Sequence, residues 1–252
     1  MLLKGKTALL TGSNKGLGLD ILKKLSHNGC NIIACTRKKD LEFDDLIKKL
    51  SNENKNKITN LNFDISDSKS IDNSLSEAIK NFKDIDFLIN NAGVIHNSLF
   101  MMTPLKKIEE VLRVNLISVI QITQIVAKKM IQKKSGLIIN ISSSSAKENN
   151  FGRSIYSSSK NAIESITKSL SKELGRFNIR ANCISPGLID TDMLRKNTSK
   201  DNIEKTIKRI SSGKIGIPED VSNLILFLCS DEAKYINGEV ISIDGGLTLD
   251  GW

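Results

Sequence analysis

Cysteine is scarce in this sequence of 252 residues, and the few cysteines are scattered through apolar segments. The four are Cys30, Cys35, Cys183 and Cys229. Their wide spacing excludes the short paired spacings of zinc sites and the dense disulfide frameworks of small secreted proteins. The two histidines, His27 and His96, have no second ligand at metal spacing. We therefore expect reduced, mostly buried thiols and no metal centre.

Long hydrophobic runs are also absent. The segment 1–10 is interrupted by charge and glycine, so it fits neither a signal peptide nor a membrane-spanning helix. No longer uncharged apolar run follows it. These absences predict a cytoplasmic protein without a membrane partner.

Aromatic residues make up only 4% of the chain, which leaves few side chains on which nucleic-acid bases would stack. The formal net charge is nevertheless +9. The lysines are dispersed along polar helix faces with acids interleaved, for example at Lys23-Lys24 and Lys106-Lys107. This distribution predicts a solvated, lysine-rich surface and no nucleic-acid partner.

What the chain does contain is a regular alternation of short β-branched runs with longer segments of helical period. The expected strands are 7–11, 31–36, 58–63, 87–90, 136–142, 180–184 and 239–243. The expected helices are 17–28, 40–54, 67–82, 105–132, 156–177 and 218–230. Strands such as 137–141 are almost continuously apolar, as in parallel sheets that helices cover on both faces. The pattern predicts an α/β fold of the Rossmann type, with a doubly wound, seven-stranded parallel sheet flanked by helices.

The length and the 39% hydrophobic content suit a single domain over residues 1–252. Neither a linker nor an internal repeat interrupts it. Residues 190–213 are polar, lack a clear strand and follow the sixth expected strand. We expect this lid segment, residues 190–213, to cover the substrate.

A glycine-rich turn directly follows the first expected strand, in the order Thr11-Gly12-Ser13-Asn14-Lys15-Gly16-Leu17-Gly18. Glycines let the backbone approach a pyrophosphate, and the next helix supplies free N–H groups and the positive end of its dipole. The spacing is G-x-x-x-G-x-G instead of the commoner G-x-G-x-x-G. Because the turn joins a strand to a helix in a parallel sheet, it indicates a dinucleotide site.

A tyrosine and a lysine stand four residues apart, at Tyr156 and Lys160, at the start of an expected helix. An ammonium group one helical turn from a phenol favours the phenolate and should lower the phenol pKa from about 10 toward neutrality. Such a pair suits proton transfer to a carbonyl oxygen whose carbon receives a hydride. A run of serines, 142–145, follows the fifth expected strand, where parallel-sheet enzymes expose their site residues.

With Asn90-Asn91-Ala92-Gly93 and Asn237-Gly238-Glu239-Val240, these motifs make the chain resemble the short-chain dehydrogenase/reductase family. The resemblance covers nearly the whole length and favours the branch that includes the 3-oxoacyl-acyl-carrier-protein reductases. It implies a catalytic set of Asn115, Ser143, Tyr156 and Lys160. In that set Ser143 would bond the substrate oxygen, Tyr156 would donate the proton, and Asn115 would hold a water that links Lys160 to solvent.

The same resemblance assigns residues to the cofactor: Gly12, Asn14, Lys15, Gly16, Leu17, Gly18, Arg37, Asp64, Ile65, Asn91, Ala92, Gly93, Tyr156, Lys160, Pro186, Gly187, Ile189 and Thr191. Asp64 would accept a hydrogen bond from adenine, and residues 186–191 would orient the nicotinamide carboxamide. The second expected strand ends in Thr36-Arg37-Lys38, without a carboxylate that would repel a 2′-phosphate. The basic pair Lys15 and Arg37 therefore predicts NADP(H).

The expected substrate is a small-molecule carbonyl compound, and the resemblance allows that acyl carrier protein presents it near Lys133, Lys134 and Arg176. The arginines usual in that group are missing from residues 96–102. A reductase that modifies a sugar or sugar nucleotide for a surface polysaccharide is therefore an alternative within the same chemistry. A non-catalytic NADP-binding sensor or scaffold is an alternative of another class. The resemblance also implies a homotetramer, packed through residues 105–132 and 156–177, with a second contact at the chain end, 247–252.

Overall fold

The computed structural model describes residues 1–82 and 84–249. In these residues one parallel sheet has the strand order β3-β2-β1-β4-β5-β6-β7. The strands are β1 (Thr7–Thr11), β2 (Asn31–Thr36), β3 (Ile58–Asn62), β4 (Phe87–Asn90), β5 (Gly136–Ile141), β6 (Ile179–Pro186) and β7 (Val240–Ile243). The strand order reverses beside β1, which confirms the predicted doubly wound, Rossmann-type sheet.

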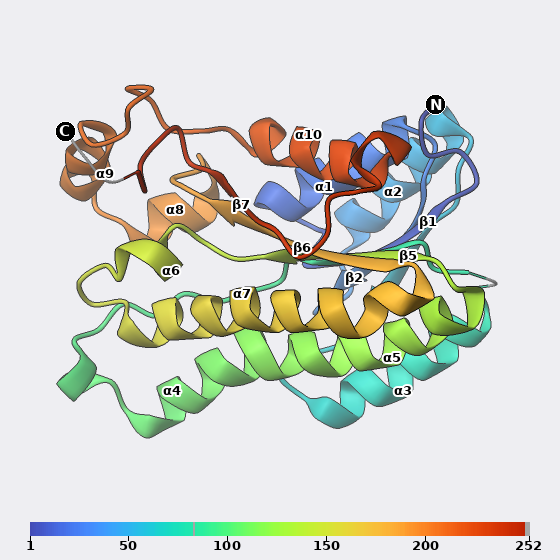
Figure 1. The fold of residues 1–252 in the computed structure, drawn as a ribbon, viewed down its shortest axis with the longest axis horizontal. Helices are drawn as coiled ribbons and strands as arrows, with labels where there is room; N and C mark the ends of the chain where they lie inside the picture. The colour runs from blue at the N-terminus through green and yellow to red at the C-terminus, as the bar shows by residue number, and fades with distance from the viewer. Residues whose placement is uncertain (83, 250–252) are drawn as a thin grey trace.

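Helices cover both faces of this sheet (Figure 1). On one face lie α1 (Gly16–His27), α2 (Leu41–Asn54) and α10 (Pro218–Cys229). On the other lie α3 (Ser68–Lys80), α4 (Leu105–Leu112), α5 (Ser118–Lys133) and α7 (Ser154–Leu174). Three short helices gather at one end of the molecule, on the left in Figure 1: α6 (Ser145–Glu148), α8 (Asp192–Asn197) and α9 (Lys200–Ile207).

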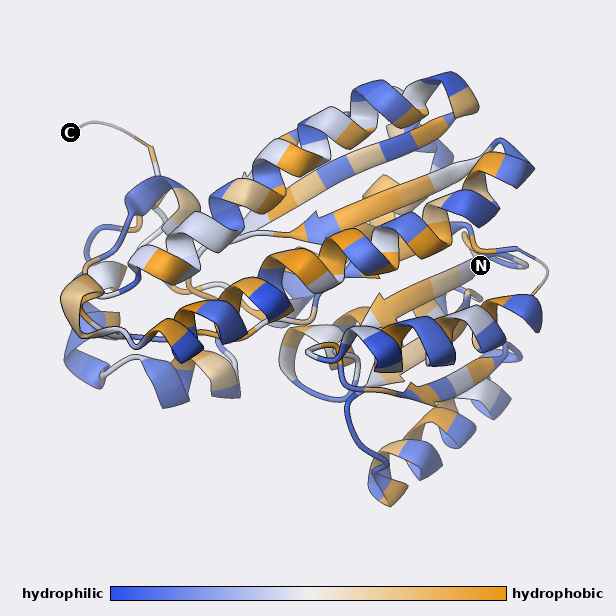
Figure 2. Cartoon of the chain, turned by 90° about the horizontal axis from the view of Figure 1, so that it is seen from below, coloured by the Kyte–Doolittle hydropathy of each residue, from blue (hydrophilic) through white to orange (hydrophobic). Residues whose placement is uncertain are grey.

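The core consists of two apolar layers, one on each face of the sheet. Successive strand residues point to opposite faces, so Leu9 and Ile33 pack with α3 and α5, whereas Ala8 and Ile32 pack with α1, α2 and α10. Figure 2 shows the consequence, since the strands are mainly hydrophobic and the helices alternate between hydrophobic and hydrophilic residues. The helices thus bury one stripe each and expose the other to solvent.

The expected helix 105–132 is interrupted. Between α4 and α5 the backbone adopts a π-helical turn, Arg113–Ile117, with Asn115 at its centre. Hydrophobic periodicity does not reveal such a turn, because one extra residue hardly changes the apolar stripe. The expected helix 156–177 begins earlier, at Ser154, and ends in a 3₁₀ turn, Gly175–Phe177. The expected strand 180–184 extends over Ile179–Pro186.

By length and composition, one helical segment, Leu105–Lys133, is apolar enough to cross a membrane. Half of its most apolar window is buried inside the protein, where α5 packs against α3 and β5. All four cysteines are buried and free, as predicted, and burial raises the pKa of the Cys30 thiol to about 12. The predicted contact at the chain end falls partly on residues 250–252, which lie outside the described residues.

Candidate active site

The predicted site residues gather at the edge of the sheet where the parallel strands end. The glycine-rich turn follows β1, Arg37 follows β2, Asp64 and Ile65 follow β3, residues 91–93 follow β4, Ser143 follows β5, and residues 187–191 follow Pro186, the last residue of β6. Ligands of doubly wound sheets bind at this edge, beside the point where the strand order reverses. The topology therefore brings both predicted sets, for the cofactor and for catalysis, to one end of the molecule.

The glycine-rich turn packs directly against the loop that follows β4. Gly12 has a φ of +68°, and a Cβ there would lie 3.0 Å from the Cα of Ala92. A Cβ on Gly18 would collide with the carbonyl oxygen of Gly12. The Asn91 amide donates to the carbonyls of Thr11 and Gly12 at 3.0 and 3.1 Å. Glycine is therefore required by the close approach of two backbones, one of which forms the start of α1.

Thr11 opens the glycine-rich turn, and the sequence analysis gave it no role of its own. Its Oγ1 accepts hydrogen bonds from the backbone N–H groups of Asn91 and Ala92, both at 3.0 Å. This hydroxyl fastens the end of β1 to the loop after β4. The available signal was a hydroxyl-bearing residue at the last position of an apolar strand.

The start of α1 leaves backbone donors for an anion. No side chain caps this helix, Lys15 is its exposed N-cap residue, and α1 contains no acid in its first turn. The partly buried Asn14 and Leu17 flank this point. A helix N-terminus of this kind has unsatisfied N–H groups and a positive dipole end, which suit a phosphate.

The end of β2 carries positive charge at the protein surface. Arg37 and Lys38 are exposed there, and no carboxylate follows the strand directly. Asp64, after β3, accepts hydrogen bonds from the backbone N–H and hydroxyl of Ser66 at 2.9 and 2.7 Å. Partial burial raises the pKa of Asp64, but the Ser66 bonds and the charges of Arg37 and Lys38 outweigh it and lower that pKa overall. Asp64 thus offsets part of the local positive charge.

Tyr156 and Lys160 lie buried on α7, in contact range of Ser143. The ammonium nitrogen of Lys160 donates to the carbonyl of Ile141 at 2.8 Å and lies 5.8 Å from the centre of the Tyr156 ring. The Ser143 hydroxyl lies near enough to the phenol of Tyr156 to lower its pKa. The structure therefore brings together the three side chains that the sequence singles out for proton transfer.

The protonation of this pair differs from the prediction. Burial raises the pKa of Tyr156 above its ordinary value, although the nearby Ser143 hydroxyl and the positive charge of Arg153 both lower it. Burial lowers the pKa of Lys160 to about 8. The expected shift of the phenol toward neutral pH is therefore wrong in direction, because desolvation of a buried phenolate outweighs the nearby positive charge.

Asn115 occupies the π-helical turn and faces the loop after β4. Its Oδ1 accepts from the Val94 N–H and its Nδ2 donates to the Val94 carbonyl, both at 2.9 Å. The same Nδ2 donates to the Ser159 hydroxyl at 3.1 Å, a partner that the sequence analysis missed although it lies one turn after Tyr156. A Cβ on Gly93 would stand 3.3 Å from the Asn115 oxygen and 3.6 Å from the Lys160 nitrogen. The loop after β4 thus joins the cofactor set to the catalytic set.

Ser142 and Ser143 have different surroundings. The Ser142 hydroxyl is buried and donates to the Glu164 carboxylate at 2.7 Å. The Ser143 hydroxyl lies beside the phenol and accepts from the backbone N–H of Ser145 at 3.2 Å. Ser142 therefore bonds the end of β5 to α7, whereas Ser143 lies beside Tyr156.

The segment after β6 links the glycine-rich turn to the lid segment. A Cβ on Gly187 would lie 2.7 Å from the Cα of Asp244, so this position also needs glycine. Ile189 forms a parallel bridge with Gly216. Thr191 caps α8 by accepting from the Leu194 N–H, and its side chain lies 3.8 Å from a Cβ placed on Gly16. Residues 187–191 therefore form the wall that faces the start of α1.

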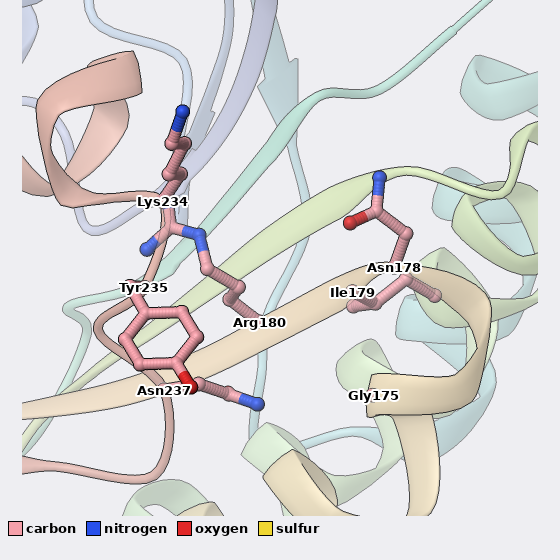
Figure 3. A pocket seen from close by; sticks show the side chains of 7 residues that line it. All are labelled: Gly175, Asn178, Ile179, Arg180, Lys234, Tyr235 and Asn237. Atoms are coloured by element: carbon pink, nitrogen blue, oxygen red, sulfur yellow. The ribbon is translucent and has the colours of Figure 1, made fainter.

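A separate hollow of about 330 Å³ lies around the opposite, amino-terminal end of β6 (Figure 3). It is lined by Gly175, Asn178, Ile179, Arg180, Lys234, Tyr235 and Asn237. The Arg180 guanidinium donates to the carbonyls of Ile236 and Leu228 at 3.1 and 2.7 Å, so it fixes the backbone there. None of the predicted site residues lines this hollow.

Comparison with known proteins agrees with this geometry. The family model described as enoyl-(acyl carrier protein) reductase matches residues 12–248. The 3-oxoacyl-(acyl-carrier-protein) reductase FabG of Aquifex aeolicus is 37% identical over 97% of this chain and 98% of its own length. Carbonyl reductase family member 4 of Xenopus tropicalis is 33% identical over 97% of this chain and 98% of its own.

Solved structures give the same result. A gluconate 5-dehydrogenase from Burkholderia cenocepacia, in complex with NADP and tartrate, superposes with a TM-score of 0.92 at 28% identity and covers 99% of this chain and 97% of its own. The fold of this chain is therefore shared with a solved structure that matches it end to end. The chain belongs to the short-chain dehydrogenase/reductase family of NAD(P)-dependent oxidoreductases.

Proposed function

We propose that this protein is an NADPH-dependent carbonyl reductase, also able to act as an alcohol dehydrogenase, whose substrate is a 3-oxoacyl group carried on acyl carrier protein. One observation carries the reaction class: the phenol of Tyr156 is buried next to Ser143 and Lys160 at the edge where the strands end. The substrate rests on the full-length similarity to reductases of that name from Aquifex aeolicus and Thermotoga maritima, at 37% and 35% identity.

The residues at this edge fit a nicotinamide dinucleotide phosphate. Gly12 and Gly18 let the glycine-rich turn pack tightly against itself and against the loop after β4, a compact turn at a helix start that suits a pyrophosphate. The exposed Lys15 and Arg37 would hold the 2′-phosphate, with Asp64 against the adenine. When bound, the cofactor supplies the hydride for the carbonyl carbon.

The protein's own task is to deliver a proton to the carbonyl oxygen. Ser143 and Tyr156 would both donate hydrogen bonds to that oxygen. Because burial raises the phenol pKa, Tyr156 stays protonated at neutral pH, which is the form that can donate. Lys160, with a pKa of about 8, can return a proton to the phenol near neutral pH, and Asn115 would link it to solvent through a water.

The basic residues proposed to meet the acyl carrier protein differ in availability. Lys133 forms an ion pair with the buried Asp86, so its ammonium group is already paired within the protein. Lys134 and Arg176 are exposed and remain candidates for an acidic partner. Carrier recognition by this chain would therefore depend on Lys134 and Arg176.

Reduction of a sugar or sugar nucleotide is a second candidate. It is favoured by the structural similarity to a gluconate 5-dehydrogenase crystallised with NADP and tartrate. The proposed substrate end of the molecule also carries polar side chains from three segments, namely Asn97, Arg153 and Thr198. A non-catalytic NADP-binding sensor remains the alternative of another class, and it predicts cofactor binding without turnover of any carbonyl compound.

For assembly we propose a cytoplasmic homotetramer. Large apolar side chains stand exposed beside α4 and before α7: Leu99, Phe100, Met101, Met102, Leu105 and Phe151. Several of them line a hollow of about 550 Å³ with Ser154 and Ser158 of α7. Packing of a second copy against this surface would remove these side chains from water.

The decisive variant is Tyr156→Phe, assayed with NADPH and an acetoacetyl thioester. We expect turnover to fall by about 10³-fold, because the proton donor is lost, while NADPH binding changes by less than about twofold. Tyr235→Phe is the matched control, since Tyr235 is the other tyrosine of the chain and is 99% exposed. Normal turnover by Tyr156→Phe would remove the proposed mechanism.

A further inference from the structure

Arg153, the residue before α7, connects three segments that are far apart in the sequence. Its Nε donates to the Asn97 side-chain oxygen at 3.1 Å, in the loop after β4. Its Nη2 donates to the Thr198 hydroxyl at 3.0 Å, between α8 and α9. One partly buried guanidinium therefore ties the lid segment to the loop after β4 and to the start of α7.

A further bond closes this arrangement into a ring. The Asn97 amide donates to the backbone carbonyl of Asn197 at 2.6 Å. Asn97 and Arg153 thus both hold the turn at residues 197–198. The turn lies at the junction of α8 and α9, so fixing it restrains both helices of the lid segment.

The other polar contacts of the lid segment lie elsewhere. Arg209, beyond α9, forms an ion pair with Glu148 of α6. Within the lid segment itself, Arg195 donates two hydrogen bonds to the carboxylate of Asp190. They run from Nε and Nη2, each at 2.9 Å. Of these three arginines, Arg153 is the one that contacts both the lid segment and the loop after β4.

Arg153 also lies three residues before Tyr156. Its positive charge lowers the pKa of the Tyr156 phenol, and both residues belong to the start of α7. A side chain that fixes the lid at this position therefore fixes it beside the proton donor.

We propose that Arg153 is a positioning residue that fastens the lid segment over Tyr156 by joining Asn97 to Thr198. The inference rests on the proposed function, because it assigns the substrate to the space that these segments border. Lysine cannot replace arginine here, since a guanidinium presents several N–H donors in a rigid plane and can bond two separate acceptors, whereas an ammonium is a compact point charge.

Three variants test this role with NADPH and an acetoacetyl thioester. Arg153→Lys keeps the charge near Tyr156 but loses the two-sided contact, and Thr198→Val removes the acceptor with little change of shape. Each should raise KM for the thioester by about tenfold, the loss of one charge-assisted hydrogen bond, with kcat changed by less than about threefold. The double variant should be no worse than Arg153→Lys alone, because both changes break the same bond. Lys172→Gln, an exposed charge change near the other end of α7, is the control.

A second readout does not depend on catalysis. Trypsin can cleave the lid segment after Arg195, Lys196, Lys200, Lys205, Lys208 and Arg209. Arg153→Lys and Thr198→Val should speed cleavage at these sites several-fold relative to wild type and Lys172→Gln. Unchanged cleavage and unchanged KM would overturn the proposal, as would a loss of kcat at constant KM, which would assign Arg153 to the phenol instead. Faster cleavage in a protein that does not reduce the thioester would sustain the role of Arg153 and contradict the proposed substrate.

Discussion

The two sides of the candidate active site are built in different ways. On the cofactor side the contacts are between backbones, as where Gly12 meets Ala92 and where Asn91 and Thr11 bond main-chain groups. On the substrate side the contacts are between side chains of separate loops, as in the ring of Asn97, Arg153 and Thr198. Backbone contacts demand particular residues, chiefly glycine, whereas side-chain contacts can be made by many combinations.

This difference explains why the cofactor is easier to infer than the substrate. The pyrophosphate is common to NAD and NADP, and close backbone approach leaves a recognisable pattern of glycines. A substrate pocket made of loops such as residues 146–154 and 190–213 has no such pattern, and the fold alone does not identify the substrate.

The largest effect is expected at Lys160, where the two sides meet. Lys160→Met should lower turnover by about 10³-fold, because the group that returns the proton to Tyr156 is lost. NADPH affinity should fall as well, because Lys160 is also predicted to contact the cofactor. If Lys160→Arg loses as much turnover as Lys160→Met, the reaction needs the ammonium group of lysine and not merely a positive charge. Full activity of Lys160→Met in steady-state assays would contradict the proton path.

A smaller but more selective effect is expected at the glycine-rich turn. Gly12→Ala should weaken NADPH binding by about 100-fold, because the Cβ would press on the backbone at Ala92 and displace the glycine-rich turn. Gly5→Ala is a matched control, since Gly5 also has a positive φ, +82°, but no atom within 4 Å of its Cβ position. Fluorescence titration with NADPH measures both. Equal affinity losses in the two variants would show that backbone strain, and not the contact with Ala92, is responsible.

Cofactor choice should change by about tenfold at Arg37. Arg37→Gln removes a positive charge from the end of β2 and should weaken NADPH binding while leaving NADH binding almost unchanged. Lys39→Gln makes the same charge change two residues away on an exposed side chain. If both variants reduce NADPH affinity equally, general positive charge and not a specific contact selects the phosphate.

The smallest effect concerns stability and pH. The folded pKa of Lys160 is about 8, below its ordinary value of 10.5, so between these pH values the unfolded chain binds more protons than the folded protein. The free energy of unfolding should therefore rise with pH in this window, by up to about 1 kcal/mol per pH unit. Urea denaturation of wild type and Lys160→Met at pH 7.5 and 9.5 isolates this contribution, which the variant should lack. An identical pH dependence in both proteins would show that Lys160 is not desolvated.

Much of the fold was predictable because the strands are short, apolar and regularly spaced. Local deviations were not, above all the π-helical turn at Asn115 and the short helix α6, since neither changes the apolar pattern. The residues of the catalytic set are a prediction from the family resemblance, and the structure brings Ser143, Tyr156 and Lys160 together. The protonation of Tyr156 was not predicted correctly, because its pKa depends on how deeply the phenol is buried. Sequence spacing does not give burial.

Contacts between loops were also beyond the reach of the sequence. Arg153 stands in a polar stretch with no motif, and its partners Asn97 and Thr198 are 56 and 45 residues away. Lys133 illustrates the converse, because it looked available for an acidic carrier but is engaged by Asp86 from the start of β4. Charge patterns in sequence indicate which groups are present, whereas only the fold shows which of them are already paired.

The most direct measurement is the oxidation of NADPH and NADH by the wild-type protein with an acetoacetyl thioester, beside a panel of keto-sugars and simple ketones. We expect rapid turnover of the thioester with NADPH and much slower turnover with NADH. Activity on a keto-sugar alone would support the proposed reaction but contradict the proposed acyl substrate. A preference for NADH would contradict the roles given to Lys15 and Arg37, and NADPH binding without oxidation by any carbonyl compound would contradict the proposed enzyme.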